Sequence, residues 1–340
     1  MHFDSAKAVT MRAAQEHLQC RVCNFTAKQV VHVAREMMYG TRQPFDYFQC
    51  GRCGCLQIGT IPKNIGDFYR SDYYSLKQNH AAFYKNRTKN FLNRLRDWAT
   101  LFIAGGEHLP FMVKVPHIAA SYRALRRVPG LSLSTRILDV GCGSGQLLYR
   151  LRNAGFRHLT GIDPFLAEDR HVDAGLSILK RSLATVEGEF DLILLNHSFE
   201  HVDDPLQTSR EITKKLSDGG TALIRIPVAD SAAWEEYNID WFQLDAPRHL
   251  YLHTRASMKL VAQQANLQLF DLLYDSGPEQ FVVSERYRRG LPMIPDPENS
   301  GLESEVFEVT PAQQRSYRKR AEQLNLGQRG DQASFYFRKA

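Results

Sequence analysis

A run of alternating glycines lies near the centre of this 340-residue chain. Residues 137–145 read Ile-Leu-Asp-Val-Gly-Cys-Gly-Ser-Gly. The apolar residues suit a strand buried on both faces, and the glycines permit a tight turn and a close approach of the backbone to a ligand. Residues 146–151 then predict a helix whose first N–H groups point back at the loop. This arrangement is typical of nucleotide binding, but the spacing is G-x-G-x-G and not the dinucleotide G-x-G-x-x-G.

The composition is that of an ordinary globular protein, with 43% hydrophobic and 24% charged residues. The net charge of +6 fits an anionic small molecule as well as nucleic acid and decides neither. No apolar run is long enough to span a bilayer, and residues 1–16 lack the hydrophobic region of a secretory signal. We therefore expect a cytoplasmic protein without a membrane span.

Two C-x-x-C pairs mark the first predicted domain, residues 1–62. Without an export signal, this spacing favours a metal over disulfides. Strand-like residues between the pairs predict a zinc ribbon, in which four thiolates saturate a structural, tetrahedral Zn²⁺. His17 and Cys55 are further candidate ligands, and unliganded thiols are the alternative. The predicted zinc ligands are Cys20, Cys23, Cys50 and Cys53.

The rest of the chain divides into a helical segment and a larger α/β domain. Residues 63–128 carry apolar side chains at helical spacing and predict a helical lid or linker. From residue 129 to 340, strands and helices alternate, which predicts a Rossmann-like, seven-stranded, doubly wound α/β sheet with ligands at the carboxyl ends of its strands. Asp204 and Pro205 predict a helix start, and Gly219 and Gly220 its end. The predicted strands are 137–140, 159–163, 177–179, 190–195, 221–226, 269–274 and 334–337.

Three segments of this domain, residues 137–148, 161–164 and 195–202, resemble the cofactor motifs of class I S-adenosylmethionine-dependent methyltransferases in order and spacing. The resemblance implies S-adenosyl-L-methionine as cofactor, with Asp139 near its ammonium group and the glycine amides near its amino acid part. Asp163 closes the second strand, where an acid can accept both ribose hydroxyls. Turn capping is the alternative for both acids. The implied cofactor residues are Asp139, Gly141, Cys142, Gly143, Gly145, Asp163, Asn196 and His197.

One departure from the family concerns adenine. Many members place an acid just after the third strand, where this chain reads Leu-Lys-Arg-Ser-Leu over residues 179–183. Adenine recognition is therefore left to the backbone or to Ser182. The missing acid also favours, weakly, a domain that binds cofactor without catalysis.

Methyl transfer to an alcohol or an activated carbon needs a general base, a role that suits histidine. His197, Glu200 and His201 come after the fourth strand, in a run similar to ubiquinone-pathway O-methyltransferases and sugar methyltransferases. The alternative is that Glu200 and His201 only organise the next helix.

The insert at 241–253 offers a second group of candidates, because it gathers rings and titratable groups in one loop. His249 is a rival base there, and Arg248 is a candidate clamp for phosphate or carboxylate. In similar sugar methyltransferases a tyrosine-rich segment closes over the cofactor, and Tyr69, Tyr73 and Tyr74 are the matching cluster here. The alternative is that they form a hydrophobic seam between the ribbon and the helices. The predicted substrate residues are Tyr73, Tyr74, Trp241, Asp245, Arg248 and His249.

The residues after the fourth strand also bear on the identity of the acceptor. Residues 196–199 lack the prolines typical of enzymes that methylate nitrogen in nucleobases or glutamine, which favours oxygen or carbon. A zinc ribbon ahead of this core resembles deoxysugar C-methyltransferases, although their carboxyl-terminal half is longer. We therefore expect a sugar or nucleotide sugar as substrate. The alternative is a ribbon that binds RNA or protein, with nucleic acid the less favoured partner. The sequence leaves the oligomeric state open.

Overall fold

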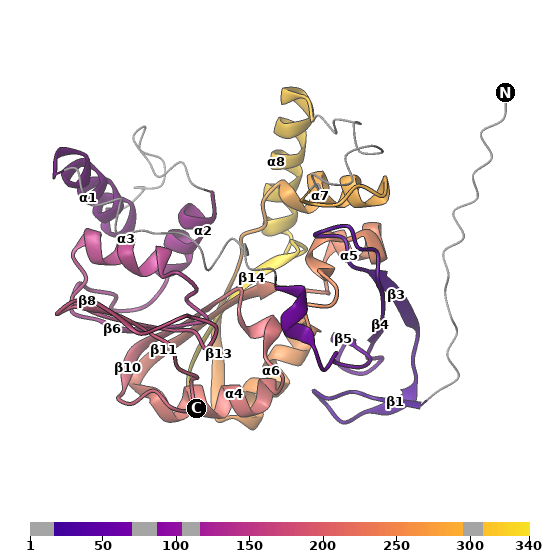
Figure 1. Ribbon diagram of the computed structural model, residues 1–340, viewed down its shortest axis with the longest axis horizontal. Helices are drawn as coiled ribbons and strands as arrows, with labels where there is room; N and C mark the ends of the chain where they lie inside the picture. The colour runs from indigo at the N-terminus through magenta and orange to yellow at the C-terminus, as the bar shows by residue number, and fades with distance from the viewer. Residues whose placement is uncertain (1–16, 70–86, 104–115, 295–308) are drawn as a thin grey trace. The chain divides into compact units, whose positions relative to one another are not determined.

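The computed structural model describes residues 17–69, 87–103, 116–294 and 309–340 (Figure 1). The chain forms two compact units, and each unit combines segments that are distant in sequence. The first, here called the ribbon unit, comprises Met1–Phe68, Pro227–Met258 and Ser276–Asp331; the second, the sheet unit, comprises Tyr69–Ile226, Lys259–Asp275 and Gln332–Ala340. The expected division into three consecutive domains, with boundaries at residues 62 and 128, remains a prediction. The two compact units do not follow these boundaries, because each combines segments from several parts of the chain.

The sheet unit contains an eight-stranded sheet of order β13-β14-β11-β10-β6-β7-β9-β8. Seven of these strands confirm the predicted fold, and β8 is an additional edge strand antiparallel to β9. Strand β6 pairs in parallel with both β7 and β10, so the order reverses beside it, and ligands of such sheets bind at this switch point. The strands are β6 (Arg136–Val140), β7 (His158–Ile162), β8 (Arg170–Asp173), β9 (Leu176–Leu179), β10 (Phe190–Asn196), β11 (Leu216–Pro227), β13 (Leu267–Tyr274) and β14 (Gln332–Lys339).

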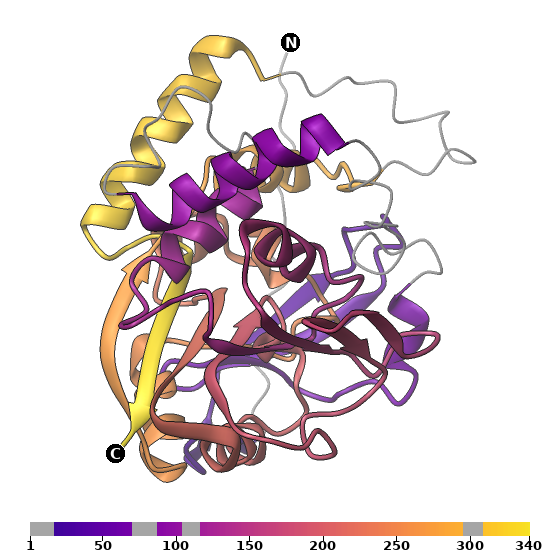
Figure 2. The same ribbon diagram turned by 90° about the vertical axis from the view of Figure 1, so that its left-hand side faces the viewer.

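Helices cover the two faces of this sheet. In Figures 1 and 2, α1 (Arg87–Phe102), α2 (Pro116–Leu125) and α3 (Gln146–Ala154) lie on one face, and in Figure 1 α4 (Pro205–Lys215) lies on the other. Apolar side chains fill the space between, because strands buried on both faces present them to both layers. Strand β14, yellow in Figure 2, runs beside β13 and completes the sheet.

The start of α4 confirms the prediction, and its end does not. The carboxylate of Asp204 accepts a hydrogen bond from the amide of Gln207 at 2.9 Å, and Pro205 opens the helix. The predicted stop at Gly219 and Gly220 is wrong: the helix ends at Lys215, and β11 begins at once with Leu216. The buried Leu216 pairs with Phe190, and the glycines instead lie where the register of β11 against β10 shifts.

The ribbon unit contains a four-stranded antiparallel sheet of order β12-β5-β4-β3. One edge strand of this sheet, β12, follows β11 in the sequence, and its Tyr251 pairs with Gln57 of β5. The elements of this unit are β1 (His17–Gln19), β2 (Thr26–Lys28), β3 (Val31–Arg35), β4 (Pro44–Gln49), β5 (Leu56–Ile58), η1 (Ile65–Phe68), α5 (Ala232–Tyr237), η5 (Asn238–Asp240), η6 (Phe242–Leu244), β12 (Tyr251–Leu252), α7 (Glu279–Arg288) and α8 (Pro311–Leu326). Helix α6 (Arg255–Gln264) continues into the sheet unit.

Across the described ranges, we find no helix that combines the length and the apolar character needed to cross a membrane.

Candidate active site

The glycine loop joins β6 to α3 at the switch point of the sheet. Gly141 has φ +74°, and a Cβ added there would lie 2.5 Å from the Cβ of Ser198, so no larger side chain fits without a shift. The amide of Gly143 donates to Oδ2 of Asp163 at 3.0 Å. Glycine is therefore required at position 141 because Ser198 packs closely on it, and Asp163 fixes the loop at the carboxyl ends of β6 and β7.

Asp163 directly follows β7 and is fixed by two backbone amides. Its Oδ2 accepts from Gly143, and its Oδ1 accepts from Phe165 at 2.9 Å. The capping role considered for this acid is thus real. A carboxylate offers about four acceptor positions, so two such bonds leave capacity for a ligand hydroxyl.

Asp139 lies in β6 with only 4% of its surface exposed. Burial raises the pKa of its carboxyl to about 7, and the nearby charge of Asp163 contributes to this rise. Burial also raises the pKa of the Cys142 thiol well above its usual value, which keeps this thiol neutral. Two carboxyl groups at adjacent strand ends form a site that a cationic ligand would stabilise.

A second group of polar side chains follows β10. Asn196 donates from Nδ2 to the Ser121 hydroxyl at 3.4 Å. His197 adopts φ +53°, and its ring nitrogens lie 3.3 Å from Oε1 of Glu200 and 2.9 Å from Nη1 of Arg225. Because arginine only donates, Nε2 of His197 accepts this bond, and the neutral ring carries its proton on Nδ1, toward Glu200.

His201 closes the short helix η4 (Phe199–His201) and contacts Tyr69. The Tyr69 hydroxyl lies 3.2 Å from Nδ1 of His201, and the Tyr69 ring stacks on Phe165 with centroids 6.1 Å apart. Tyr69 thereby connects the end of β7 with the end of β10. The predicted Tyr73 and Tyr74 lie outside the described residues.

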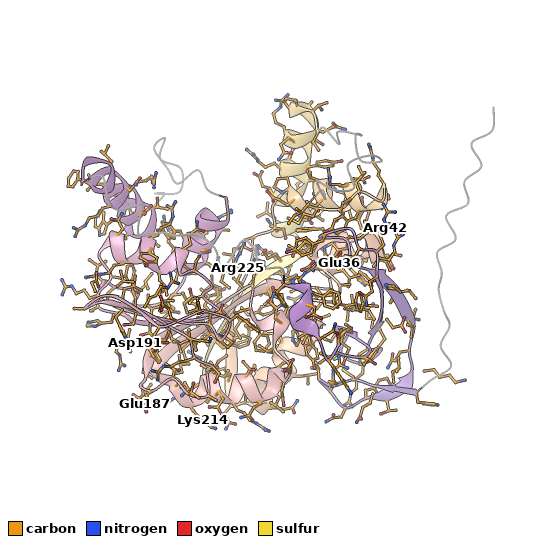
Figure 3. The ribbon with its side chains drawn as sticks, viewed as in Figure 1. Glu36, Arg42, Glu187, Asp191, Lys214 and Arg225 are labelled. Atoms are coloured by element: carbon orange, nitrogen blue, oxygen red, sulfur yellow. The ribbon has the colours of Figure 1, made fainter. Side chains whose placement is uncertain are left out.

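Arg225 and Asp275 were not among the residues expected from the sequence. Nε of Arg225 donates to Oδ2 of Asp275 at 2.7 Å, and Nε2 of Gln332 donates to Oδ1 of Asp275 at 2.8 Å. Arg225 lies near the carboxyl end of β11, opposite the edge where Asp191 lies near the start of β10 (Figure 3). A signal was present, since Arg225 is the single charged residue of the apolar run 222–228.

The loop at 241–253 belongs to the ribbon unit, where its polar side chains contact one another and the core of that unit. Nε1 of Trp241 donates to Oδ2 of Asp331 at 3.0 Å, and burial raises the pKa of that carboxyl to about 6. Trp241 is fully buried. Its predicted contact with substrate remains a hypothesis that this burial disfavours.

Arg248 is fully buried between two carboxylates of its own unit. Its Nη2 lies 3.0 Å from Oε1 of Glu36 and 2.5 Å from Oδ1 of Asp245, and Nη1 donates to the carbonyl of Phe68 at 3.3 Å. These carboxylates raise the pKa of Arg248 in spite of its burial. Arg248, the predicted clamp for a substrate anion, is therefore already paired with carboxylates of the protein. Asp245, a predicted substrate residue, is in turn paired with the guanidinium of Arg248.

His249 is buried in the same loop. Its Nδ1 lies 2.6 Å from the carbonyl of Gln243, which can only accept, so the neutral ring carries a proton there. Its Nε2 then holds a lone pair, 3.8 Å from Oδ2 of Asp245. The Tyr47 hydroxyl donates to the carbonyl of His249 at 2.8 Å. This tautomer is the one that a general base at Nε2 requires.

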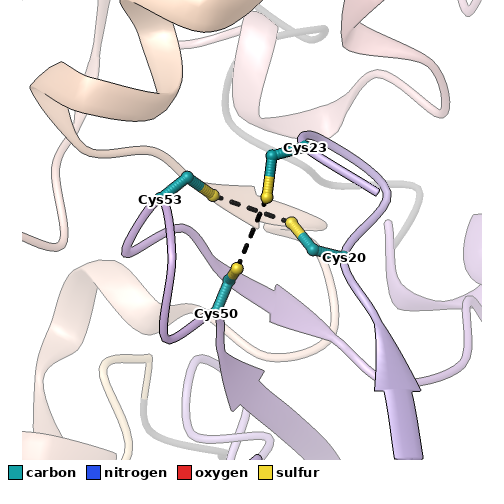
Figure 4. Close-up of side chains that lie close together, drawn as sticks. All are labelled: Cys20, Cys23, Cys50 and Cys53. Carbon is teal, nitrogen blue, oxygen red and sulfur yellow. Dashed lines mark hydrogen bonds between the residues drawn. The ribbon is translucent and has the colours of Figure 1, made fainter. Parts of the chain in front are cut away.

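The four predicted zinc cysteines converge in the ribbon unit (Figure 4). Their sulfur atoms all lie within 4.8 Å of one another, with Cys20 and Cys53 3.7 Å apart and Cys23 and Cys50 3.6 Å apart. A hydrogen bond with Cys53 lowers the pKa of the Cys20 thiol to about 4 and raises that of Cys53.

The two cysteine turns repeat the same backbone pattern. Amides two residues further on donate to Sγ of Cys20 and of Cys50, each at 3.4 Å. The donor set, four thiols with amide donors behind them, fits tetrahedral Zn²⁺. Cys55 is buried beside His253 outside the cluster, and His17 lies in β1.

Parts of this chain are similar to known proteins. Residues 114–272 match the family described as "Methyltransferase domain". A tRNA U34 carboxymethyltransferase from Shewanella amazonensis is 30% identical over 36% of this chain and 42% of its own length. A ubiquinone biosynthesis O-methyltransferase from a Caulobacter species is 32% identical over 26% of this chain and 39% of its own length. The chain thus spans about two fifths of these curated relatives.

Among solved structures, an S-adenosylmethionine-dependent methyltransferase from Mesorhizobium loti is 17% identical, with a TM-score of 0.39 over 65% of this chain and 98% of the other. Magnesium protoporphyrin IX methyltransferase from Synechocystis is 14% identical, with a TM-score of 0.34 over 42% and 68%.

The family match covers the strands that carry the glycine loop, Asp139, Asp163 and the polar residues after β10. Over residues 114–272 the chain is therefore similar to a methyltransferase domain.

Proposed function

We propose that this protein transfers a methyl group from S-adenosyl-L-methionine to an oxygen or carbon atom of a small molecule, a sugar or nucleotide sugar. The observation that carries the proposal is the pair of strand-end acids, Asp139 and Asp163, around a glycine loop that has no room for a larger side chain at Gly141. When bound, the cofactor supplies an electrophilic methyl group on a cationic sulfur. The ribose hydroxyls would bind Asp163, and the cationic groups would offset the charges of the two acids.

The residues after β10 divide into two roles under this proposal. Both ring nitrogens of His197 contact protein groups, Arg225 and Glu200, which suits a positioning role. His201 is half-buried and contacts a tyrosine hydroxyl, which can donate or accept, so the ring is able to take up a proton from an acceptor hydroxyl. We therefore favour His201 as the base, with His249 as its rival because its lone pair is on Nε2.

Zinc in this proposal is structural. Four thiolates leave no open position on the metal, so the ion would stabilise the ribbon unit and take no part in proton or methyl transfer. The segment that carries His249 enters the same sheet through β12, and zinc would therefore also support that loop.

Cofactor binding gives the first test. Calorimetry should show that Asp163→Ala weakens S-adenosylmethionine binding about tenfold to a hundredfold, because charge-assisted bonds to the ribose are lost. Asp218→Ala is the matched control, since the side chain of Asp218 is fully exposed. Equal affinity of Asp163→Ala and the unchanged protein would overturn the ribose assignment.

Turnover with a panel of nucleotide sugars gives the second test. His201→Ala and His249→Ala should both keep cofactor affinity, and the variant that loses turnover identifies the base. If both retain turnover, the proposed base catalysis is wrong.

An RNA acceptor is the second candidate, favoured by the tRNA-directed relatives. The ribbon unit offers positive surface charge, because Arg21, Arg35 and Arg52 are exposed, although the first two also contact the protein itself. Arg21 donates to the carbonyl of Ile58 at 2.5 Å, and Arg35 lies 3.8 Å from Asp240. RNA binding that falls steeply with salt would support this candidate, and no binding at low salt would exclude it.

A further inference from the structure

A small pocket lies between α2 and the carboxyl ends of β10 and β11. Its walls are apolar, formed by leucine side chains of α2, α3, β10 and β11. Its polar end is formed by Ser121, Asn196 and Arg225. The side chain of Arg225 is only 6% exposed, so this end of the pocket holds a buried guanidinium.

The guanidinium of Arg225 is only partly matched by the protein. Nε donates to Asp275, and Nη1 donates to Oδ1 of Asn196 at 3.1 Å and to His197. Within the described residues, no acceptor bonds to Nη2 of Arg225. Nη2 carries two donor hydrogens, so it can donate to a ligand oxygen that enters the pocket.

The position of this guanidinium relates it to the cofactor site. Its bonds to Asn196 and His197 hold it over the carboxyl end of β10, next to β6. Asp139 pairs with Leu194, so Gly141, two residues further on, lies level with Asn196. An acid at the end of β6 and a cation over the end of β10 therefore flank the first glycine of the loop.

We infer that Arg225 binds the α-carboxylate of the cofactor's amino acid part, while Asp139 faces its ammonium. An α-amino acid carries both charges on one carbon, and opposite protein charges on neighbouring strands complement it. Arginine suits a carboxylate because its planar donors match the two oxygens. Asp275 does not preclude this, since one guanidinium can serve two carboxylates, as Arg248 does in the ribbon unit. The inference rests on the proposed cofactor site.

The test compares S-adenosylmethionine with decarboxylated S-adenosylmethionine, which keeps the sulfonium and the ammonium. Calorimetry on the full chain should show at least tenfold tighter binding of the complete cofactor. Arg225→Gln should weaken that binding about tenfold to a hundredfold and change the affinity for the decarboxylated compound less than about twofold. Arg225→Lys, which keeps the charge and loses the planar fork, should fall between.

Two further variants keep the test decisive. Asp275→Asn leaves the guanidinium with less negative charge around it, so the preference for the complete cofactor should grow several-fold. Arg127→Gln is the matched control, because Arg127 forms an Arg–Asp pair with Asp271 and does not line the pocket.

Three results would overturn the inference. They are no preference in the unchanged protein, a preference that survives in Arg225→Gln, and an equal loss for both compounds. If neither compound binds the unchanged protein, the proposed function fails with it; if both bind, only the carboxylate assignment is at stake.

Discussion

Two buried arginines show how differently the ribbon unit and the sheet unit use polar groups. In the ribbon unit, Arg248 lies between Glu36 and Asp245, and its guanidinium also donates to a backbone carbonyl. In the sheet unit, Arg225 has one carboxylate partner and lines a pocket at the carboxyl ends of β10 and β11. All three guanidinium nitrogens of Arg248 donate within the protein, whereas Nη2 of Arg225 is available to a ligand. The residue type alone does not separate the two cases.

Loss of the metal should have the largest effect on the stability of the ribbon unit, because the thiolates of the cysteine cluster need an external ion to balance their charge. We expect Cys20→Ser to lower the zinc content from about one ion per chain to near zero and to destabilise the unit by several kcal/mol. Metal analysis and thermal unfolding measure both.

Cys55→Ser serves as the control for the cysteine variant. Cys55 is buried outside the cluster, so this change should leave the zinc content intact. A protein purified without zinc, or an unchanged zinc content in Cys20→Ser, would contradict the assignment.

Arg248→Met should have the next largest effect. It leaves two carboxylates buried without their cation, which costs about 3–5 kcal/mol. Urea unfolding measures the loss, and Arg329→Met, which removes a surface pair with Glu235, should change little. If Arg248→Met keeps its stability and loses turnover instead, Arg248 is the substrate clamp first suggested by its sequence context.

The sequence was informative where contacts are local or repeat along a strand. Seven strands are visible in the sequence as apolar runs, and the helix cap at Asp204 is visible because Pro205 follows it directly. Strand β12 was not, because its pairing of Tyr251 with Gln57 has no local signature.

The roles of individual site residues depend still more on distant partners. The charge of Arg248 was visible in the sequence, but its partner Glu36 lies 212 positions away. Arg225 is a lone charge in an apolar strand, which is a signal in the sequence, but its partner Asp275 belongs to the end of another strand. Motifs identify a site, and only the fold tells which of its charges are already paired.

A third, smaller effect is expected from the charge of Asp139, which belongs to the proposed ligand site of the sheet unit. Its carboxyl has a pKa of about 7 in the free protein and about 3.9 in an unfolded chain. The folded state therefore holds the proton more tightly, and the stability of the free protein falls as the pH rises from about 4 through 7.

A cationic ligand binds the ionised carboxylate, so its affinity should change in the opposite sense. S-adenosylmethionine should bind about eightfold more tightly at pH 7.5 than at pH 6, as the ionised fraction of Asp139 increases. Calorimetry across this range measures the change, and Asp139→Asn should remove it. The same rise in that variant would show that another group titrates.

The smallest expected effect concerns a third arginine, Arg127. Its pair with Asp271 has a geometry similar to that of the buried pairs but lies at the surface, so a comparison with them shows the effect of burial alone. Both oxygens of Asp271 lie 2.8 Å from guanidinium nitrogens, a geometry as good as that of the buried pairs. Arg127 lowers the pKa of Asp271, yet its own side chain is 45% exposed. Water screens such a pair, so Arg127→Gln should lower the free energy of unfolding by less than about 1 kcal/mol, and less still in high salt. Urea unfolding at two salt concentrations measures this. A loss as large as that of Arg248→Met would mean that geometry, not burial, sets the value of these pairs, and the contrast between the two buried arginines would then need another cause.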